Sequence, residues 1–244
     1  MKAIIIDDER LARAELRKLL QDFPEIEVID EAANADEGAQ KIENSNPDLI
    51  FLDIQMPGKT GFDLLADLDR APHVIFTTAY DEYALKAFEV NALDYLLKPI
   101  EPKRLADAVH KLQTLDTTNG YHSTTTEGGN RTLLTENDQV FVKDGERCWF
   151  VKLNEIRLFE SVGNYAKVFF GPHKPLILKS LNALEERLDE KTFFRANRKH
   201  IVNLRLIDKI EPYFNGGLLL ELKGGEKIEV SRRQTVKFKE MMSL

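Results

Sequence analysis

Cysteine, tryptophan and long apolar runs are scarce in this sequence of 244 residues. The one cysteine excludes an internal disulfide and a cysteine-rich zinc site, and its apolar surroundings predict that Cys148 is a packed thiol. No apolar run approaches the ~18 residues of a membrane-spanning helix, and the short apolar run after Lys2 is too short for the core of a signal peptide. We therefore expect a cytoplasmic protein that does not contact a membrane.

Positive charge is scarce in the first half of the chain. Residues 1–122 carry 13 lysines and arginines against 24 aspartates and glutamates, whereas residues 123–244 carry 21 against 17. This imbalance indicates different partners for the two halves, although the positive excess of the second half is by itself weak evidence for nucleic acid. The length also exceeds the ~100 to 200 residues of a common single core, so we expect two domains.

The first half alternates short apolar runs with amphipathic stretches. The pattern predicts strands at residues 2–7, 26–32, 48–53, 73–78 and 93–98, each followed by a helix, at residues 9–21, 36–44, 62–68, 82–90 and 102–115. Near-continuous apolarity in the strands is typical of a parallel sheet covered by helices on both faces. The predicted fold is α/β, a doubly wound five-stranded parallel sheet, in a domain of residues 1–115.

A different composition follows this domain. Residues 116–137 are rich in Thr, Gly, Asn and Ser and predict a flexible linker. Residues 138–244 contain β-branched and aromatic runs, with hairpin signals at Asp144-Gly145 and Gly224-Gly225. Two helices are expected within them, at residues 181–190 and 232–242. The second domain is therefore predicted to be mostly β.

Charged and hydroxyl side chains follow the ends of the predicted strands. They are Asp7, Asp8, Asp53, Thr78 and Lys98. Ligands of an open parallel sheet bind beyond the carboxyl ends of the strands, so these side chains converge on one edge. Three carboxylates placed together repel one another and favour a hard cation such as Mg²⁺, which takes oxygen ligands. With Lys98 and Thr78 they describe a pocket for a small anion attached to, or attacked by, Asp53.

Simpler interpretations exist for each of these residues alone. Asp7 and Asp8 can cap the helix that follows them, and Lys98 can be a surface charge. Five residues at the correct strand ends together favour the functional interpretation. Two other classes of protein with a similar fold are less consistent with the sequence. A phosphatase would need a catalytic Asp-x-Asp on one strand, which none of the predicted strands contains. A flavin protein is disfavoured because the acidic residues after the first strand would repel the phosphate of the flavin.

The acidic site also carries a family resemblance. The segments IIIDDE, DLIFLDIQMPGKTGFDLL, FTTAY and DYLLKPI resemble the receiver domain of bacterial two-component response regulators, from residue 2 to about residue 115. The resemblance implies that Asp53 accepts a phosphoryl group from a phosphohistidine of a sensor histidine kinase. It also implies that Asp8, Asp53 and the backbone carbonyl of Gln55 bind Mg²⁺, with Asp7 acting through water, and that Lys98 holds the phosphoryl oxygens.

The same resemblance implies a switch rather than an enzyme. Such a domain promotes only its own Mg²⁺-dependent phosphorylation and dephosphorylation, and the added charge biases a two-state element that contains Thr78 and Tyr95. Phosphorylation would then promote a homodimer through the fourth helix, the fifth strand and the fifth helix. The candidate pair-forming residues are Lys86, Glu89, Arg104 and Asp107.

Basic residues cluster twice in the second half. The first cluster is Arg195, Arg198, Lys199 and His200, although such a cluster is more often a solvated face than a nucleic-acid site. The second follows Ser231, in a Ser-x-x-Gln sequence typical of a capping box, which places Arg232 and Arg233 in the first turn of a helix. Cations there oppose the helix dipole by ~0.3 to 1 kcal/mol each, a cost that a bound phosphate would offset.

A second resemblance covers this half. The segments IRLFESVGNYAKVFF, LNALEERL, FFRANRKHIVNLRLI and IEVSRRQTVKF resemble the LytTR DNA-binding domain over about residues 138–241, so the whole chain is similar to response regulators of the LytR/AlgR type. The resemblance implies a mostly β module that places loops in the major groove of promoter DNA. The implied DNA-binding residues are Asn164, Tyr165, Lys167, Arg195, Asn197, Arg198, Lys199, His200, Arg232 and Arg233. The chain has Ala166 and Arg198 where some members have His or Asn, and an arginine can read guanine bidentately.

Two alternative functions remain for the second half: it could bind another protein, or it could be an enzyme. Residues 123–244 contain no Ser/His/Asp or metal-ligand spacing, which disfavours the enzyme. Loss of promoter binding with rising salt would distinguish DNA binding from protein binding.

Overall fold

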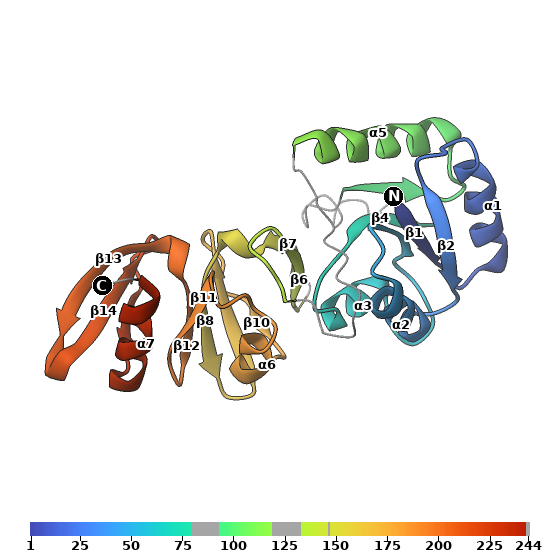
Figure 1. Cartoon of the computed structure of the whole chain (residues 1–244). Coiled ribbons are helices and arrows are strands. Elements are labelled where there is room, and N and C mark those ends of the chain that lie inside the picture. Colours follow the sequence, from blue (N-terminus) through green and yellow to red (C-terminus); the bar gives the residue numbers. More distant parts are fainter. Residues whose placement is uncertain (80–92, 119–132, 146, 243–244) are drawn as a thin grey trace. The chain divides into compact units, whose positions relative to one another are not determined.

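The computed structural model describes residues 1–79, 93–118, 133–145 and 147–242 (Figure 1). The chain forms two compact units, Met1–Gly128 with Gly145–Phe150 and Gly129–Asp144 with Val151–Leu244. Among the helices of the described residues, none is long and apolar enough to cross a membrane.

The first unit is built on a five-stranded parallel sheet with the strand order β2-β1-β3-β4-β5. Its strands are β1 (Lys2–Ile6), β2 (Glu27–Ala32), β3 (Leu49–Asp53), β4 (His73–Thr78) and β5 (Asp94–Leu97). Every residue of β3 is buried, as expected of a central strand with helices on both faces. The predicted fold class of this half is confirmed.

Helices cover both faces of this sheet. They are α1 (Arg10–Leu20), α2 (Ala35–Ser45), α3 (Gly61–Asp67) and α5 (Pro102–Thr118). On one face, Leu16 of α1 and Leu105 of α5 share a core with Phe51 of β3. On the other, α2 lies beside α3 (Figure 1), and Gly38 of α2 approaches Ile6 of β1. The helix predicted at residues 82–90 lies outside the described residues.

Residues at both ends of the linker predicted over residues 116–137 belong to regular structure. At its start, α5 continues to Thr118. At its end, Leu134 is buried and forms a β-bridge with Leu188. The Leu134 amide donates to the Arg187 carbonyl at 2.7 Å, and the Leu134 carbonyl accepts from the Asp189 amide at 2.9 Å. These contacts of Leu134 anchor the end of the predicted linker to the second unit.

The second half of the chain is mostly β, as predicted. Its strands are β6 (Gln139–Asp144), β7 (Arg147–Lys152), β8 (Ile156–Val162), β9 (Tyr165–Phe170), β10 (Leu176–Ile177), β11 (Phe193–Asn197), β12 (His200–Asn203), β13 (Ile207–Tyr213), β14 (Gly217–Leu222) and β15 (Lys227–Val230). They form sheets of order β10-β9-β8-β12-β11, β13-β14-β15 and β6-β7. Both predicted hairpin signals are confirmed, with Gly145 at φ 62° and Gly225 at φ 84° in the left-handed region that glycine favours. Cys148 is buried, as expected of a packed thiol.

Two helices accompany these strands, and one is shorter than predicted. α7 (Arg232–Met242) has the predicted bounds, and its Phe238 is fully buried with its ring 5.3 Å from that of Phe194. α6 (Leu181–Glu185) ends well before residue 190. The chain turns there because Leu188 joins Leu134 in the β-bridge, which takes it out of the helix.

Candidate functional sites

The carboxylates predicted to converge do so at the carboxyl edge of the parallel sheet. Asp7 directly follows β1 and Asp53 ends β3; both are buried, whereas Asp8 is exposed. One carboxylate oxygen from each of the three lies within 4.8 Å of the others. Carboxylate oxygens are hard donors of the kind that divalent cations such as Mg²⁺ and Ca²⁺ take. The cluster therefore fits a divalent cation.

Lys98 lies between the two buried carboxylates. Its Nζ is 2.7 Å from Asp53 Oδ2 and 2.8 Å from Asp7 Oδ2. The position follows from the backbone, because the Lys98 amide donates to the Thr78 carbonyl at 2.8 Å and so continues the pairing of β5 with β4. One ammonium group thus compensates two carboxylates that would otherwise repel each other in a buried site.

Burial shifts the protonation of this pair. It raises the pKa of the Asp53 carboxyl and outweighs the opposing hydrogen bond from Lys98. Burial also opposes the charge of Lys98, but its hydrogen bonds to Asp53 and Asp7 prevail and raise the pKa of the ammonium. A cation placed among the three carboxylates would favour ionised Asp53.

The alternative interpretation, that Asp7 or Asp8 caps α1, is wrong. The N-cap residue is Glu9, whose side chain makes no capping bond. Asp7 Oδ1 instead accepts from the Glu9 amide at 2.9 Å, which fixes its carboxylate at the sheet edge. The simpler reading of Lys98 as a surface charge is also wrong, since its side chain is only 14% exposed.

The remaining receiver residues surround this cluster. The Gln55 amide donates to Asp53 Oδ1 at 3.1 Å, which orients the carboxylate from the loop after β3. Thr78 ends β4 and is fully buried, and Tyr95 lies in β5 opposite Phe76 and is partly exposed. The sheet thus brings the predicted first-half site residues to one edge, apart from Tyr95, which lies two residues before the end of β5.

Gly61 is a residue of this site that the sequence analysis missed. A Cβ at Gly61 would lie 2.4 Å from the Asp53 carbonyl oxygen and 3.0 Å from Leu52 Cγ. The closeness arises because the Gly61 amide donates to the Ile54 carbonyl at 2.9 Å, which draws the start of α3 against the end of β3. Only glycine fits there without moving the backbone of Asp53.

We expect Gly61→Ala to destabilise the first unit by ~1 to 3 kcal/mol, because the new methyl group overpacks against backbone that cannot yield. Urea denaturation of the variant and the wild type measures this. The same variant should accept phosphoryl groups more slowly, since Asp53 would be displaced. Unchanged stability would show that the start of α3 can move away freely.

The predicted DNA-binding residues of the second unit gather at one end of its strands. Gly163 and Asn164 form the turn between β8 and β9, and Arg198 and Lys199 form the turn between β11 and β12. These two turns lie side by side, because the Ser161 amide donates to the Lys199 carbonyl at 2.8 Å.

The start of α7 joins the same end. The Ser231 amide donates to the Ala196 carbonyl at 2.9 Å, and Asn197 Nδ2 donates to the Glu229 carbonyl at 2.7 Å. Arg232 and Arg233 follow directly and are both exposed. We call this surface the basic end; it consists of Asn164, Tyr165, Arg198, Lys199, Arg232 and Arg233.

Three predicted contact residues are occupied by interactions within the protein. Asn197 Oδ1 accepts from the Lys199 amide at 2.8 Å and lies 3.0 Å from His200 Nδ1. Lys167 forms an ion pair of 3.5 Å with Glu160. Burial lowers the pKa of His200 despite nearby Glu160, so this imidazole is uncharged near neutral pH.

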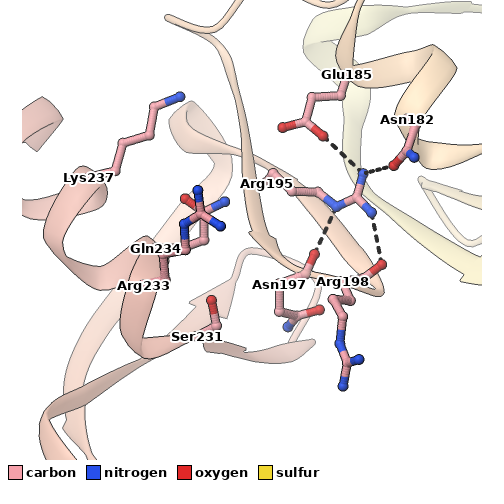
Figure 2. Close-up of a pocket in the computed structure, with 9 residues that line it drawn as sticks. All are labelled: Asn182, Glu185, Arg195, Asn197, Arg198, Ser231, Arg233, Gln234 and Lys237. Carbon is pink, nitrogen blue, oxygen red and sulfur yellow. Dashed lines mark hydrogen bonds and ion pairs between the residues drawn. The ribbon is translucent and has the colours of Figure 1, made fainter.

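Arg195 points into the protein and supports the turn beside it. Its guanidinium donates to the carbonyls of Asn197 and Arg198 at 2.8 and 2.9 Å, and Nη1 is 3.1 Å from Glu185 Oε2. Figure 2 shows Arg195 directed toward α6, whereas the side chain of Arg198 points away from it. A hollow of about 480 Å³ lies here, lined by Asn182, Glu185, Arg195, Asn197, Arg198, Ser231, Arg233, Gln234 and Lys237. No sequence pattern indicates the roles of Asn182 and Glu185, because their contacts with Arg195 join separate elements.

Two family models match the chain, one for each half. The response regulator receiver domain matches residues 3–110, and the LytTr DNA-binding domain matches residues 146–243. An uncharacterized response regulatory protein of Vibrio cholerae is 39% identical over 99% of this chain and 98% of its own length. Sensory transduction protein LytT of Enterococcus faecalis is 34% identical over the full length of both. The solved response regulatory domain of protein mrkE from Klebsiella pneumoniae is 33% identical, covers 49% of this chain and all of its own, and has a TM-score of 0.45.

Proposed function

Because the chain belongs to the response regulators that join a receiver domain to a LytTR DNA-binding domain, we propose that phosphorylation of Asp53 controls its binding to promoter DNA. As a member of this family it is a transcription regulator of two-component systems. The proposal that Asp53 is phosphorylated rests mainly on one observation: Lys98 Nζ lies within 2.8 Å of two buried carboxylates. A compensated, buried aspartate at a sheet edge suits transfer of an anionic group better than a structural role.

The proposed reaction is attack of an Asp53 carboxylate oxygen on the phosphorus of a phosphohistidine in a sensor histidine kinase. The O–P bond forms as the P–N bond to the histidine breaks. Lys98 neutralises the negative charge of the transferred group, and the Gln55 amide holds the other oxygen of Asp53. Asp8, Asp53 and the Gln55 carbonyl would hold Mg²⁺, with Asp7 acting through water. The ion would supply further neutralisation of the phosphoryl oxygens.

Thr78 is the residue through which phosphorylation of Asp53 would change the conformation of the domain. Its hydroxyl is buried at the end of β4, so its turn toward a new phosphoryl group requires neighbouring side chains to move. Tyr95, on the adjacent strand, would move inward with it. This pair supplies the two-state element on which the added charge acts.

Dimerisation is the proposed output of that switch, through the face that contains β5 and α5. Arg104, one candidate pair-former, is 3.2 Å from buried Asp94 and 3.9 Å from Asp107. It would have to leave or share Asp94 to bind a second copy. The other two candidates, Lys86 and Glu89, lie outside the described residues.

DNA would be bound by the basic end. Asn164, Arg198 and Lys199 lie in turns that can enter a groove, and Tyr165 follows the first of these turns. Arg232 and Arg233 suit phosphates at a helix start. Asn197, His200 and Lys167 are proposed to fix the turns, in view of their internal partners. One experiment tests the whole proposal: sedimentation and DNA titration with and without beryllofluoride, which mimics a phosphoryl group. Equal mass and equal affinity in both states would contradict it.

Arg195 is proposed as a positioning residue rather than a DNA contact. We expect Arg195→Ala to weaken DNA binding about tenfold without lowering the salt dependence by the one unit typical of a lost phosphate contact. Arg195→Lys should not restore binding, because one ammonium group cannot replace a fork that bonds two carbonyls and Glu185. Arg205→Ala is the matched control, since Arg205 is 62% exposed and pairs with Glu136 outside the basic end. A reduced salt slope for Arg195→Ala would return this residue to the phosphate contacts.

A further inference from the structure

An exposed aromatic residue occupies the turn between β13 and β14. Phe214 is 75% exposed, and its ring meets that of Tyr213 edge-on at 4.9 Å. Single exposed apolar side chains are ordinary on protein surfaces. Phe214 differs from such residues in its location, because the turn that carries it lies next to the basic end.

The turn that carries Phe214 lies beside the basic end. Tyr213 pairs with Gly217 across the hairpin, and Leu218 pairs with Val230 of β15. The turn is therefore level with Ser231, the residue that precedes Arg232 at the start of α7. It adds a fourth segment to the three that make up the basic end.

Other exposed apolar side chains lie at the same end of the strands. Val162 and Tyr165 flank the β8–β9 turn and are 38% and 46% exposed. Leu178 is 75% exposed and follows Ile177, which pairs with Ala166 next to Tyr165. The basic end thus has an exposed apolar side chain at each flank, Leu178 beyond β9 and Phe214 beyond β14.

We propose that Phe214 is a DNA contact, which covers thymine methyl groups and deoxyribose beside the phosphates bound by Arg232 and Arg233. This inference rests on the proposed DNA binding of the second domain. Duplex DNA offers anionic phosphates next to apolar methyl and sugar atoms, which is the chemistry that cations flanked by apolar groups fit. With strands ~4.8 Å apart, the turn extends the contact by ~7 Å, or about two base pairs at 3.4 Å each.

The test uses the full chain and a duplex selected by the wild type from a random pool. Phe214→Ala should bind this duplex five- to tenfold more weakly, from the loss of roughly 50 Å² of apolar contact. The salt slope should stay that of the wild type, because no charge is lost. Phe214→Leu should keep most of the affinity. Deoxyuridine in place of thymine, in the flanking two or three base pairs on one side, should weaken the wild type but not Phe214→Ala.

Met242→Ala is the control, because Met242 is 39% exposed at the far end of α7, ~15 Å from Arg232 along the helix. Wild-type affinity for Phe214→Ala, or a loss equal to that of Met242→Ala, would overturn the inference. A lowered salt slope would also overturn it, as the turn would then act through the cations. If the wild type shows no salt-dependent binding to any duplex, the proposed function fails with it.

Discussion

Asp53→Asn should abolish the incorporation of phosphoryl groups from acetyl phosphate and Mg²⁺. Asp53 combines burial at the end of β3 with an ammonium group 2.7 Å away, and asparagine offers no nucleophilic carboxylate oxygen. Incorporation into the wild type and the variant is measured by intact-protein mass, which detects one phosphoryl group. Label persisting at the wild-type level would place the phosphoacceptor elsewhere.

The chain offers a matched control for this experiment. Asp30 also accepts a hydrogen bond from a lysine, with 2.8 Å between its Oδ1 and Lys41 Nζ, but it lies in β2 and is 46% exposed. The hydrogen bond from Lys41 lowers the pKa of this carboxyl and so favours its ionised form. Asp30→Asn should therefore leave incorporation unchanged. An ionised carboxylate beside a lysine is not sufficient for phosphorylation, because Asp30 lies outside the cluster of Asp7, Asp8 and Asp53.

Lys98→Ala should separate charge neutralisation from the nucleophile. The variant keeps Asp7, Asp8 and Asp53, so it should still bind Mg²⁺, measured by calorimetry. It should accept phosphoryl groups more slowly, because two buried carboxylates lose their compensating charge.

Much of the first-half site follows from the sequence because parallel strands force it. Strands buried on both faces read as apolar runs, and their carboxyl ends must meet at one edge. Asp7, Asp53, Thr78 and Lys98 therefore fall together once five strands are recognised. Gly61 does not follow in this way, because its closeness to the Asp53 carbonyl depends on the path of a loop rather than on a periodic pattern.

The second-half surface follows less fully, because its residues come from turns whose directions no pattern fixes. Arg195 and Arg198 are three positions apart and equally basic, yet Arg195 bonds to Glu185 and two carbonyls, whereas Arg198 stands exposed at the turn. The β-bulge between Arg195 and Asn197 changes the alternation of side chains along β11. A count of basic residues cannot show which of them faces outward.

We expect Arg198 to contact bases and Arg233 to contact phosphates. Arg198 is exposed in a two-residue turn, where a side chain can reach base edges, while Arg233 lies in the first turn of α7, where backbone amides also favour phosphate. Arg198→Ala should cost ~1 to 3 kcal/mol on the preferred site and relax base preference there. Arg233→Ala should weaken all sequences about equally and lower the salt slope by about one unit.

Titration of both variants against the preferred duplex and a scrambled one, at several salt concentrations, distinguishes these roles, with Arg205→Ala as the arginine control. Equal losses on both duplexes for Arg198→Ala would make Arg198 a backbone contact, because a residue that reads bases must distinguish them. Full affinity for both variants would count against the basic end as the DNA-binding surface, since neither the β11–β12 turn nor the start of α7 would then contribute. A loss confined to Arg233→Ala would leave phosphate binding at α7 but move base recognition to the β8–β9 turn, which contains Asn164 and is followed by Tyr165.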